Sequence, residues 1–360
     1  MKVAILGDLH FGASGDSARM HAYQKRFFEE CLFPTLKERN VEHIFQLGDV
    51  FDRRKFINYY TMAMSYQNFF HPLEKNGLRM ITIVGNHDMF WKDDMSINSH
   101  SLLLSDYKNI QSISKPTVIN VKGCRFAFVP WICKSNQAEV TEFLKNCNAD
   151  VCMGHFEIEG FSMNKGSAPG SGLSPKVFER FDHTFSGHYH THSIQDNIIY
   201  TGTPYELTWI DADDPKCFFI YDTDARTYEK IINPFTLFEN LWYNPTLDSK
   251  LYRKQELEGK YVKLHIASDA PVTDWNHFNK CVSEITDSAP SELKVSDHSV
   301  VKSSEQASED VDDATNVLSA IKTNIDMVVS DDAIRSDLFS YMNGVYETAL
   351  ETIVDKDGGL

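Results

Sequence analysis

The stretch Val84-Gly85-Asn86-His87-Asp88 carries the strongest fold signal in the sequence. It ends the apolar run 80–84, which predicts a buried strand. Gly85 allows the backbone to turn sharply at the end of that strand. Asn86 offers a neutral oxygen to a metal ion, and His87 offers a nitrogen that can carry a proton. The stretch therefore predicts a chemical site if similar groups follow other strands.

Four other short polar clusters come directly after apolar runs that predict strands. They are Asp8-Leu9-His10, Gly48-Asp49-Val50-Phe51-Asp52, Gly154-His155 and Gly187-His188-Tyr189-His190. Helical spacing of apolar residues at 19–38 and 59–73 makes the first three strands a βαβαβ unit with parallel strands. Open α/β sheets place their sites just past the carboxyl ends of such strands. We therefore expect the five clusters to converge.

The five clusters together supply carboxylate, amide and imidazole groups. This mixture suits Mn²⁺, Fe²⁺ or Zn²⁺ better than Ca²⁺. There are enough ligands for two ions if one carboxylate is shared. Two ions about 3.5–4 Å apart are a common apparatus for phosphoester hydrolysis, because they activate water and offset charge on the phosphate. The clusters therefore indicate a two-metal phosphoesterase.

This ordered motif set, D-x-H, G-D-x-x-D, G-N-H-D, G-H and G-H-x-H, resembles that of the calcineurin-like metallophosphoesterases over about residues 1–235. The resemblance implies a mixed α/β fold with a four-layer αββα core. It implies that one ion is held by Asp8, His10, Asp49 and His190. It implies that the second ion is held by Asp49, Asn86, His155 and His188, with Asp49 bridging. It also implies that His87 stabilises the transition state or protonates the leaving oxygen, and that Asp88 orients His87.

Three stretches resemble a narrower group, the SbcD-type DNA repair nucleases, and among these the recombination endonucleases of tailed phages. The stretches are 48–52, 154–157 and 200–208. This likeness implies a hydrolase of DNA recombination, repair and replication, with exonuclease and endonuclease activity. It implies two divalent ions, with Mn²⁺ preferred over Mg²⁺, Fe²⁺ and Zn²⁺. The implied partners are DNA, a second copy of the chain and a coiled-coil SMC-type ATPase, in the host cytoplasm if the chain is phage-encoded.

The remainder of the chain suggests four regions. We expect a nuclease domain at 1–238, a small α+β capping domain that binds DNA at 239–296, an acidic linker at 297–330 and a helical partner-binding segment at 331–360. Within the first region we expect strands at 198–201, 217–222 and 228–232 to close a second sheet. The long Gly- and Ser-rich stretch 160–175 predicts a functional loop.

Several positions keep two interpretations. Arg53, Arg54 and Lys55 follow a metal cluster and are candidate DNA contacts, although a solvated helix face explains them equally well. Lys165 in the long loop is a weaker candidate of the same kind. Asp52 either supports a metal ligand or caps a helix. The aromatic-rich stretch 59–70 suits core or subunit packing better than base stacking.

Composition narrows the class of protein. The net charge of the 360 residues is −16, so attraction to nucleic acid depends on bound metal ions, local basic patches or a partner. Seven scattered cysteines without a C-x-x-C pair indicate reduced thiols. No signal-peptide pattern or membrane-length apolar run is present. A phosphatase of the same fold and a catalytically silent scaffold remain alternative functions.

Overall fold

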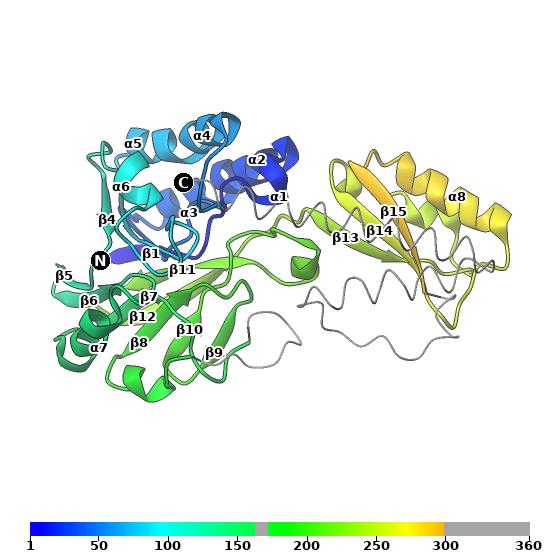
Figure 1. Cartoon of the computed structure of the whole chain (residues 1–360). Helices are drawn as coiled ribbons and strands as arrows, with labels where there is room; N and C mark the ends of the chain where they lie inside the picture. The colour runs from blue at the N-terminus through cyan, green and yellow to red at the C-terminus, as the bar shows by residue number, and fades with distance from the viewer. Residues whose placement is uncertain (163–171, 299–360) are drawn as a thin grey trace, which may run out of the picture. The chain divides into compact units, whose positions relative to one another are not determined.

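The computed structural model describes residues 1–162 and 172–298. The chain divides into two compact units, Met1–Ser299 and Val300–Leu360, and all described residues belong to the first. Lys165, most of the expected acidic linker and the expected C-terminal helical segment lie outside the described residues. Figure 1 shows two stacked sheets with helices on their outer faces, followed by a smaller sheet with its own helix.

The first sheet has six strands in the order β12-β11-β1-β2-β3-β4. Their bounds are β1 Lys2–Leu6, β2 His43–Gln46, β3 Arg79–Ile83, β4 Ile110–Ile113, β11 Cys217–Asp222 and β12 Thr227–Ile232. Strands β1 to β4 are parallel, as expected for the βαβαβ unit. The expectation that β11 and β12 close the second sheet was wrong, because β11 pairs antiparallel with β1, opposite Val3 and Ile5.

The second sheet has the order β5-β6-β7-β8-β10-β9. Its strands are β5 Thr117–Val121, β6 Cys124–Val129, β7 Val151–His155, β8 His183–Gly187, β9 Ser193–Gln195 and β10 Ile198–Tyr200. The two sheets face each other across a fully buried apolar layer. Phe45 of the first sheet places its ring 5.0 Å from the rings of both Phe126 and Phe128 of the second. This packing fixes the strand ends of both sheets relative to one another.

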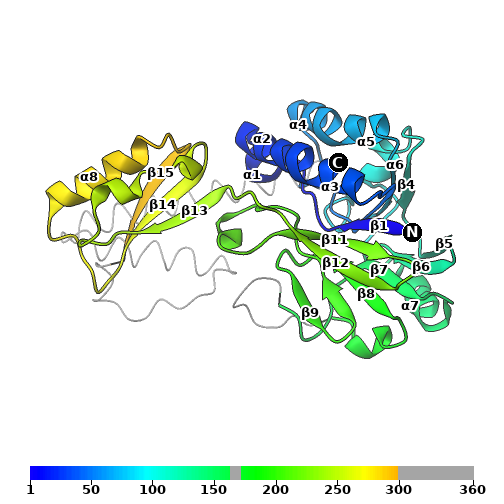
Figure 2. The same ribbon diagram turned by 180° about the vertical axis from the view of Figure 1, so that it is seen from behind.

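Helices cover the outer faces of both sheets and complete the expected αββα core (Figures 1 and 2). The α-helices of this core are α1 Ala13–Asp16, α2 Ala18–Phe27, α3 Phe33–Glu38, α4 Tyr59–Ser65, α5 His71–Lys75, α6 Ser99–Leu103 and α7 Gln137–Asn146. Each of the two helices expected from sequence is interrupted by a π turn, at Phe28–Leu32 and Tyr66–Phe70. The π turns let neighbouring aromatic residues, such as Phe69 and Phe70, both face the core. Short 3₁₀ turns lie at Pro175–Phe178, Trp209–Asp211, Ser249–Tyr252 and Gln255–Leu257.

A three-stranded parallel sheet follows the sandwich in sequence. It consists of β13 Phe238–Trp242, β14 Tyr261–Ile266 and β15 Glu292–Asp297, with α8 Trp275–Thr286 on one face. The α8 face is apolar, and Val262, Leu264 and Ile266 pack there with residues of the helix. Asp274 caps α8 by accepting hydrogen bonds from two backbone amides of its first turn. No helix among the described residues is long and apolar enough to span a membrane.

Glu206 links the sandwich to the segment that enters β13. Its side chain is buried, and Oε2 accepts hydrogen bonds from the backbone amides of Leu237 (2.6 Å) and Phe238 (2.9 Å). Burial raises the pKa of Glu206 to about 7, and the nearby Asp211 carboxylate acts in the same direction. The side chain therefore takes up a proton on folding under mildly acidic conditions.

We expect Glu206→Gln to stabilise the protein at pH 8 by about 1–3 kcal/mol, because the amide keeps an acceptor oxygen and never ionises. The pKa of Glu206 is higher in the folded chain than its ordinary 4.5. Its contribution to stability is therefore complete below about pH 4.5 and lost as the pH rises through 7. Thermal unfolding at pH 5 and pH 8 should show a gain for the variant only at pH 8. Exposed Glu179→Gln is the control, and equal shifts for both variants would contradict the assignment.

Candidate metal centre

The five polar clusters do converge at the carboxyl ends of strands from both sheets. Three groups of possible ligands have atoms that lie within 4.8 Å of one another. These groups are Asp8 with His10 and His190, His10 with Asp52 and His87, and Asp49 with His155 and His188. Six of the seven predicted metal ligands are in these groups, and the seventh, Asn86, lies against His155 and His188. All seven therefore meet, although they come from positions 8 to 190 of the chain.

Asp49 lies between the first and third of these groups. Its Oδ2 atom is 3.8 Å from His10 Nε2 and 3.3 Å from His155 Nε2. Its other oxygen, Oδ1, accepts a hydrogen bond from the backbone amide of His87 at 2.7 Å. A Cβ at Gly85 would overlap the Asp49 carboxylate, so the glycine is needed for this close approach. One carboxylate oxygen thus faces ligand nitrogens of both groups.

The group around Asp8 has the spacing of ligands that share an ion. Asp8 Oδ2 lies 3.9 Å from His10 Nε2 and 3.9 Å from His190 Nε2, which is too long for hydrogen bonds. The buried His10 Nε2 has no hydrogen-bond partner among the described residues. Metal–ligand distances of about 2.0–2.2 Å put neighbouring ligands of one ion roughly 3–3.5 Å apart. Small adjustments of these side chains therefore suffice to enclose a divalent ion.

In the group around Asn86, hydrogen bonds determine which ring nitrogen of each histidine has a free lone pair. His155 Nδ1 donates to the Leu47 carbonyl oxygen (2.7 Å), which leaves the lone pair of a neutral ring on Nε2. His188 Nε2 lies 3.2 Å from Glu157 Oε1, which leaves the lone pair on Nδ1. Both of these nitrogens face Asn86 Oδ1, at 2.8 and 3.0 Å. Three lone-pair atoms this close need a cation or a proton between them.

Electrostatics lead to the same conclusion. Burial raises the pKa of Asp8 to about 7, and the Asp49 carboxylate adds to the increase. Burial alone would lower the pKa of His10, but the nearby carboxylates of Asp52, Asp49 and Asp8 outweigh it and raise the pKa to about 9. Without a metal ion, protons on the Asp8 carboxyl group and on His10 thus offset the negative charge of the site. These residues fit divalent ions, which supply the same positive charge without the protons.

Asp88 does not orient His87, so that expectation from the resemblance was wrong. Its buried carboxylate accepts hydrogen bonds from the backbone amides of Asp49 (2.8 Å), Val50 (3.1 Å) and Gly85 (2.9 Å), and it pairs with the buried His100 at 3.1 Å. Among the described residues, the partners of this carboxylate are loop amides, Ser99 and His100, and not the His87 ring. Asp88 instead holds the loop that presents Asp49.

Asp52 and His87 form a separate contact beside the two ligand groups. Asp52 Oδ1 lies 3.2 Å from His10 Nδ1, and the Asp52 carbonyl oxygen lies 2.5 Å from His87 Nδ1. The cap of α4 is Asn58, so Asp52 is not a helix cap. Of its two interpretations, support of a ligand fits the structure. The backbone of Asp52, and not Asp88, sets the orientation of the His87 ring.

The candidate DNA contacts next to this site differ in their surroundings. Arg53 Nη1 donates to Asp16 Oδ2 at 2.7 Å, so its charge is already balanced. Arg54 Nη1 has no hydrogen-bond partner among residues 1–162 and 172–298. Lys55 is exposed. Arg53 therefore has a carboxylate partner, and contact of Arg53, Arg54 or Lys55 with a phosphate stays a prediction.

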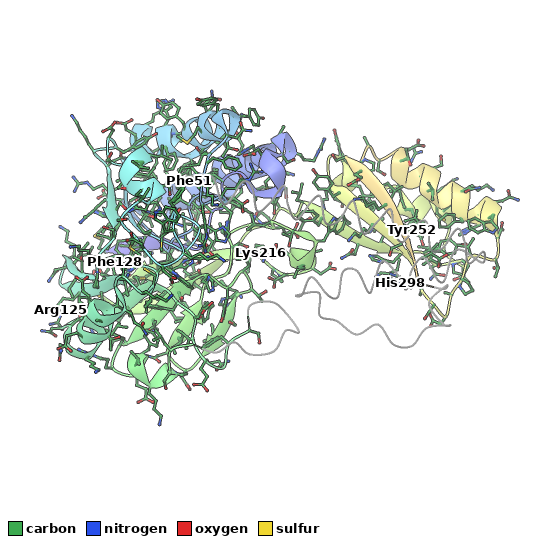
Figure 3. The ribbon with its side chains drawn as sticks, viewed as in Figure 1. Phe51, Arg125, Phe128, Lys216, Tyr252 and His298 are labelled. Carbon is green, nitrogen blue, oxygen red and sulfur yellow. The ribbon has the colours of Figure 1, made fainter. Side chains whose placement is uncertain are left out.

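Four residues around the site were missed by sequence reasoning. Trp131 packs against the rings of His155 and His188, at centroid distances of 5.8 and 4.9 Å. Lys216 Nζ donates to the His190 carbonyl oxygen at 3.0 Å (Figure 3). The other two are Glu157 beside His188 and His100 beside Asp88. Glu157 alone had a local signal, because it lies two residues after a predicted ligand.

Comparison with known proteins identifies the family. The sequence matches the family model of calcineurin-like phosphoesterases over residues 1–192. The chain belongs to this family. The chain is 35% identical over 243 residues to exonuclease subunit 1 of Enterobacteria phage T4, an alignment that covers 68% of this chain and 71% of the phage T4 protein. The phosphoesterase resemblance and the mixed α/β fold expected from the motifs are confirmed.

Comparison with solved structures gives two further proteins with partial similarity. One is an archaeal phosphodiesterase, at 17% identity and a TM-score of 0.33, covering 64% of this chain and 99% of the archaeal one. The other is GAP50, the anchor in the inner membrane complex of Plasmodium, at 16% identity and a TM-score of 0.36. That match covers 66% of this chain and 90% of GAP50.

Proposed function

We propose that this calcineurin-like phosphoesterase is a two-metal-dependent DNA nuclease that hydrolyses phosphodiester bonds. The observation that carries the proposal is the position of Asp49 Oδ2 between His10 Nε2 and His155 Nε2. A shared carboxylate is what two neighbouring ions require. DNA is the proposed substrate because the phage T4 relative is an exonuclease subunit.

The proposed ligand sets follow the geometry of the two groups. Asp8, His10 and His190 would hold one ion, His155, His188 and Asn86 would hold the other, and Asp49 would belong to both. Bound divalent ions would supply an activated water at neutral pH and positive charge for the phosphate oxygens. Mixed nitrogen and oxygen ligands suit Mn²⁺, Fe²⁺ or Zn²⁺, and Mg²⁺ is a weaker match. Mn²⁺ is the proposed ion because of the resemblance to the SbcD-type nucleases.

His87 is the proposed proton donor or transition-state stabiliser. Its ring lies 4.9 Å from the His10 ring, between centroids, and is only partly buried. Nδ1 is held by the Asp52 carbonyl oxygen, so Nε2 carries the group that can face a substrate. A ring held at one nitrogen by a backbone oxygen keeps a constant orientation during reaction.

The test is hydrolysis by the purified full chain. With Mn²⁺ it should release nucleotides from linear duplex DNA and cut single-stranded DNA, and EDTA should stop both reactions. Metal analysis should find two ions per chain. Activity on p-nitrophenyl phosphate without any on DNA would replace the nuclease with a phosphatase. A chain that binds no divalent metal would support the scaffold alternative instead.

We further propose that the chain forms a homodimer. A cavity of about 280 Å³ lies between the stretch before α4 and the segment around α6, lined by residues that include Tyr59, Met62, Ile97 and Leu102. Several of these apolar side chains are exposed, Tyr59 by 94% and Leu102 by 69%. Exposed apolar patches of this kind mark interaction sites, and a second copy of the same patch is complementary in an isologous dimer.

We expect Leu102→Glu to convert the dimer to a monomer, because the substitution would place a carboxylate in the apolar contact of each copy. Sedimentation should detect this as a halved mass. Val118→Glu is the control, since Val118 is an exposed apolar residue of β5 (38%) away from the patch. A dimer that survives Leu102→Glu would place the interface elsewhere.

We propose a coiled-coil ATPase as the second partner and the host cytoplasm as the place of action. The name of the phage T4 relative, exonuclease subunit 1, supports a partner subunit, and the resemblance to the SbcD-type nucleases implies that this partner is a coiled-coil ATPase. A partner that binds DNA would also offset the net charge of −16, which opposes DNA binding by the isolated chain. Co-purification of the chain with its ATPase from co-expressing cells tests this partner.

A further inference from the structure

The β13–β14–β15 sheet has two chemically different faces. Val262, Leu264 and Ile266 of β14 point toward α8 and are buried with it. Side chains alternate along a strand, so Lys263 and His265 lie on the opposite face. The Trp209–Asp211 turn packs on one end of this second face, with Trp209 against Phe238 and Lys263. The other end carries the exposed ring of Trp242 beside His265, and rings of this kind are common on nucleic-acid surfaces.

The end of this face carries an ordered group of three rings, which we call the ring platform: Trp242, His265 and His298. Figure 3 labels His298. The planes of His265 and His298 differ by 13°, and His265 Nδ1 lies 3.0 Å from His298 Nε2. The two imidazoles are therefore joined edge to edge. Trp242, opposite His265 in the sheet register, lies against that ring at 4.7 Å and 25°. Despite this contact, Trp242 remains 58% exposed.

Hydrogen bonds hold the ring platform in place before any ligand arrives. His265 Nε2 lies 3.0 Å from Asn240 Oδ1, and Asn240 Nδ2 donates to Asp213 Oδ2 at 3.1 Å. Rings on strands with fixed partners lose little freedom when another flat ring stacks on them. These bonds fix the imidazole of His265, and the exposed Trp242 indole lies against that ring.

A chain of contacts leads from this face to the metal centre. Lys263 Nζ lies 4.0 Å from the centre of the Trp209 ring. The turn that starts at Trp209 contains Asp211, whose carboxylate binds Lys216 Nζ at 2.5 Å. Lys216 Nζ also donates to the His190 carbonyl oxygen. The Trp209–Asp211 turn and Lys216 thus connect the sheet face that carries Lys263 to His190 of the metal centre.

We propose that this face binds an unpaired DNA strand, with a base stacked on Trp242 and the backbone phosphate near Lys263. The inference rests on the proposed nuclease function and specifies its substrate as a single strand or a frayed duplex end. Bases inside a duplex are stacked on one another and offer only their edges to a protein. A single strand offers whole base faces, and aromatic platforms with lysines are the usual way to bind them without sequence preference.

The test measures binding by the full chain in EDTA, so that no hydrolysis occurs. Fluorescence anisotropy would compare labelled dT20 with a blunt-ended hairpin duplex. Trp242→Ala should weaken dT20 binding about tenfold and change duplex binding less than twofold, because a base stack contributes to one ligand only. Trp242→Phe should restore most of the affinity for dT20. Trp275→Ala is the matched control, since Trp275 is 61% exposed on α8 and so on the other side of this sheet.

Three results would overturn the platform. They are wild-type dT20 affinity for Trp242→Ala, equal losses for Trp242→Ala and Trp275→Ala, and equal losses for dT20 and duplex. The first is also the result expected if another part of the chain or a partner protein covers the face. Because binding is measured without metal, a chain that binds dT20 through Trp242 but never cleaves DNA would refute only the proposed nuclease.

Discussion

Asp49→Asn should lower Mn²⁺-dependent hydrolysis of DNA by at least about 10³-fold. Residues that merely support a metal ligand contribute about 10–100-fold, and a ligand shared by two ions should contribute more. The Asp49 carboxylate faces His10 Nε2 and His155 Nε2, at 3.8 and 3.3 Å. Replacing it by an amide removes the charge and weakens both proposed ion sites at once.

Metal content distinguishes this effect from unfolding. The variant should bind at most one Mn²⁺ per chain by mass spectrometry of the metal, and Mn²⁺ should no longer raise its melting temperature as it does for the wild type. The amide keeps an oxygen that can accept the hydrogen bond of the His87 backbone amide, so the fold should persist. Exposed Asp106→Asn is the control. Two bound ions and near wild-type activity in Asp49→Asn would refute the shared ligand.

The convergence of ligands was predictable because it depends on a local rule. The apolar runs before Asp8, Asp49 and Asn86 predict parallel strands, and parallel strands of one sheet end at a common edge. The same reasoning works for His155 and His188 in the second sheet. The strand topology alone then determines which residues meet, so their convergence can be predicted without side-chain geometry.

Features that depend on long-range pairing or on loop geometry were not predictable. Strand β11 reads as any other apolar run, and only its pairing with β1, more than 200 residues earlier, assigns it to the first sheet. Asp88 follows His87 in the chain, which suggests a contact between them. The tight turn instead points the Asp88 carboxylate at backbone amides of residues 49–51. These amides come near Asp88 only when the two loops are folded together, so the sequence alone does not indicate the contact.

His87→Asn should lower the rate of DNA hydrolysis by about 10²–10⁴-fold while leaving two bound Mn²⁺ ions. The His87 ring is not among the proposed ligands, and its backbone amide, which donates to Asp49, is unchanged by the substitution. His87→Asn should therefore lose turnover but keep its metal ions, whereas Asp49→Asn should lose turnover and at least one of the ions. Exposed His71→Asn on α5 is the matched control and should behave as wild type.

A second substrate decides between the two roles proposed for His87. The leaving oxygen of a DNA phosphodiester needs a proton, whereas p-nitrophenolate leaves readily without one. If His87 donates that proton, His87→Asn should be strongly impaired on DNA and much less impaired on bis(p-nitrophenyl) phosphate. If it stabilises charge on the phosphate, the two losses should be equal, because that charge develops with either leaving group. Wild-type rates on both substrates would exclude His87 from the reaction and leave the chemistry to the groups around Asp49.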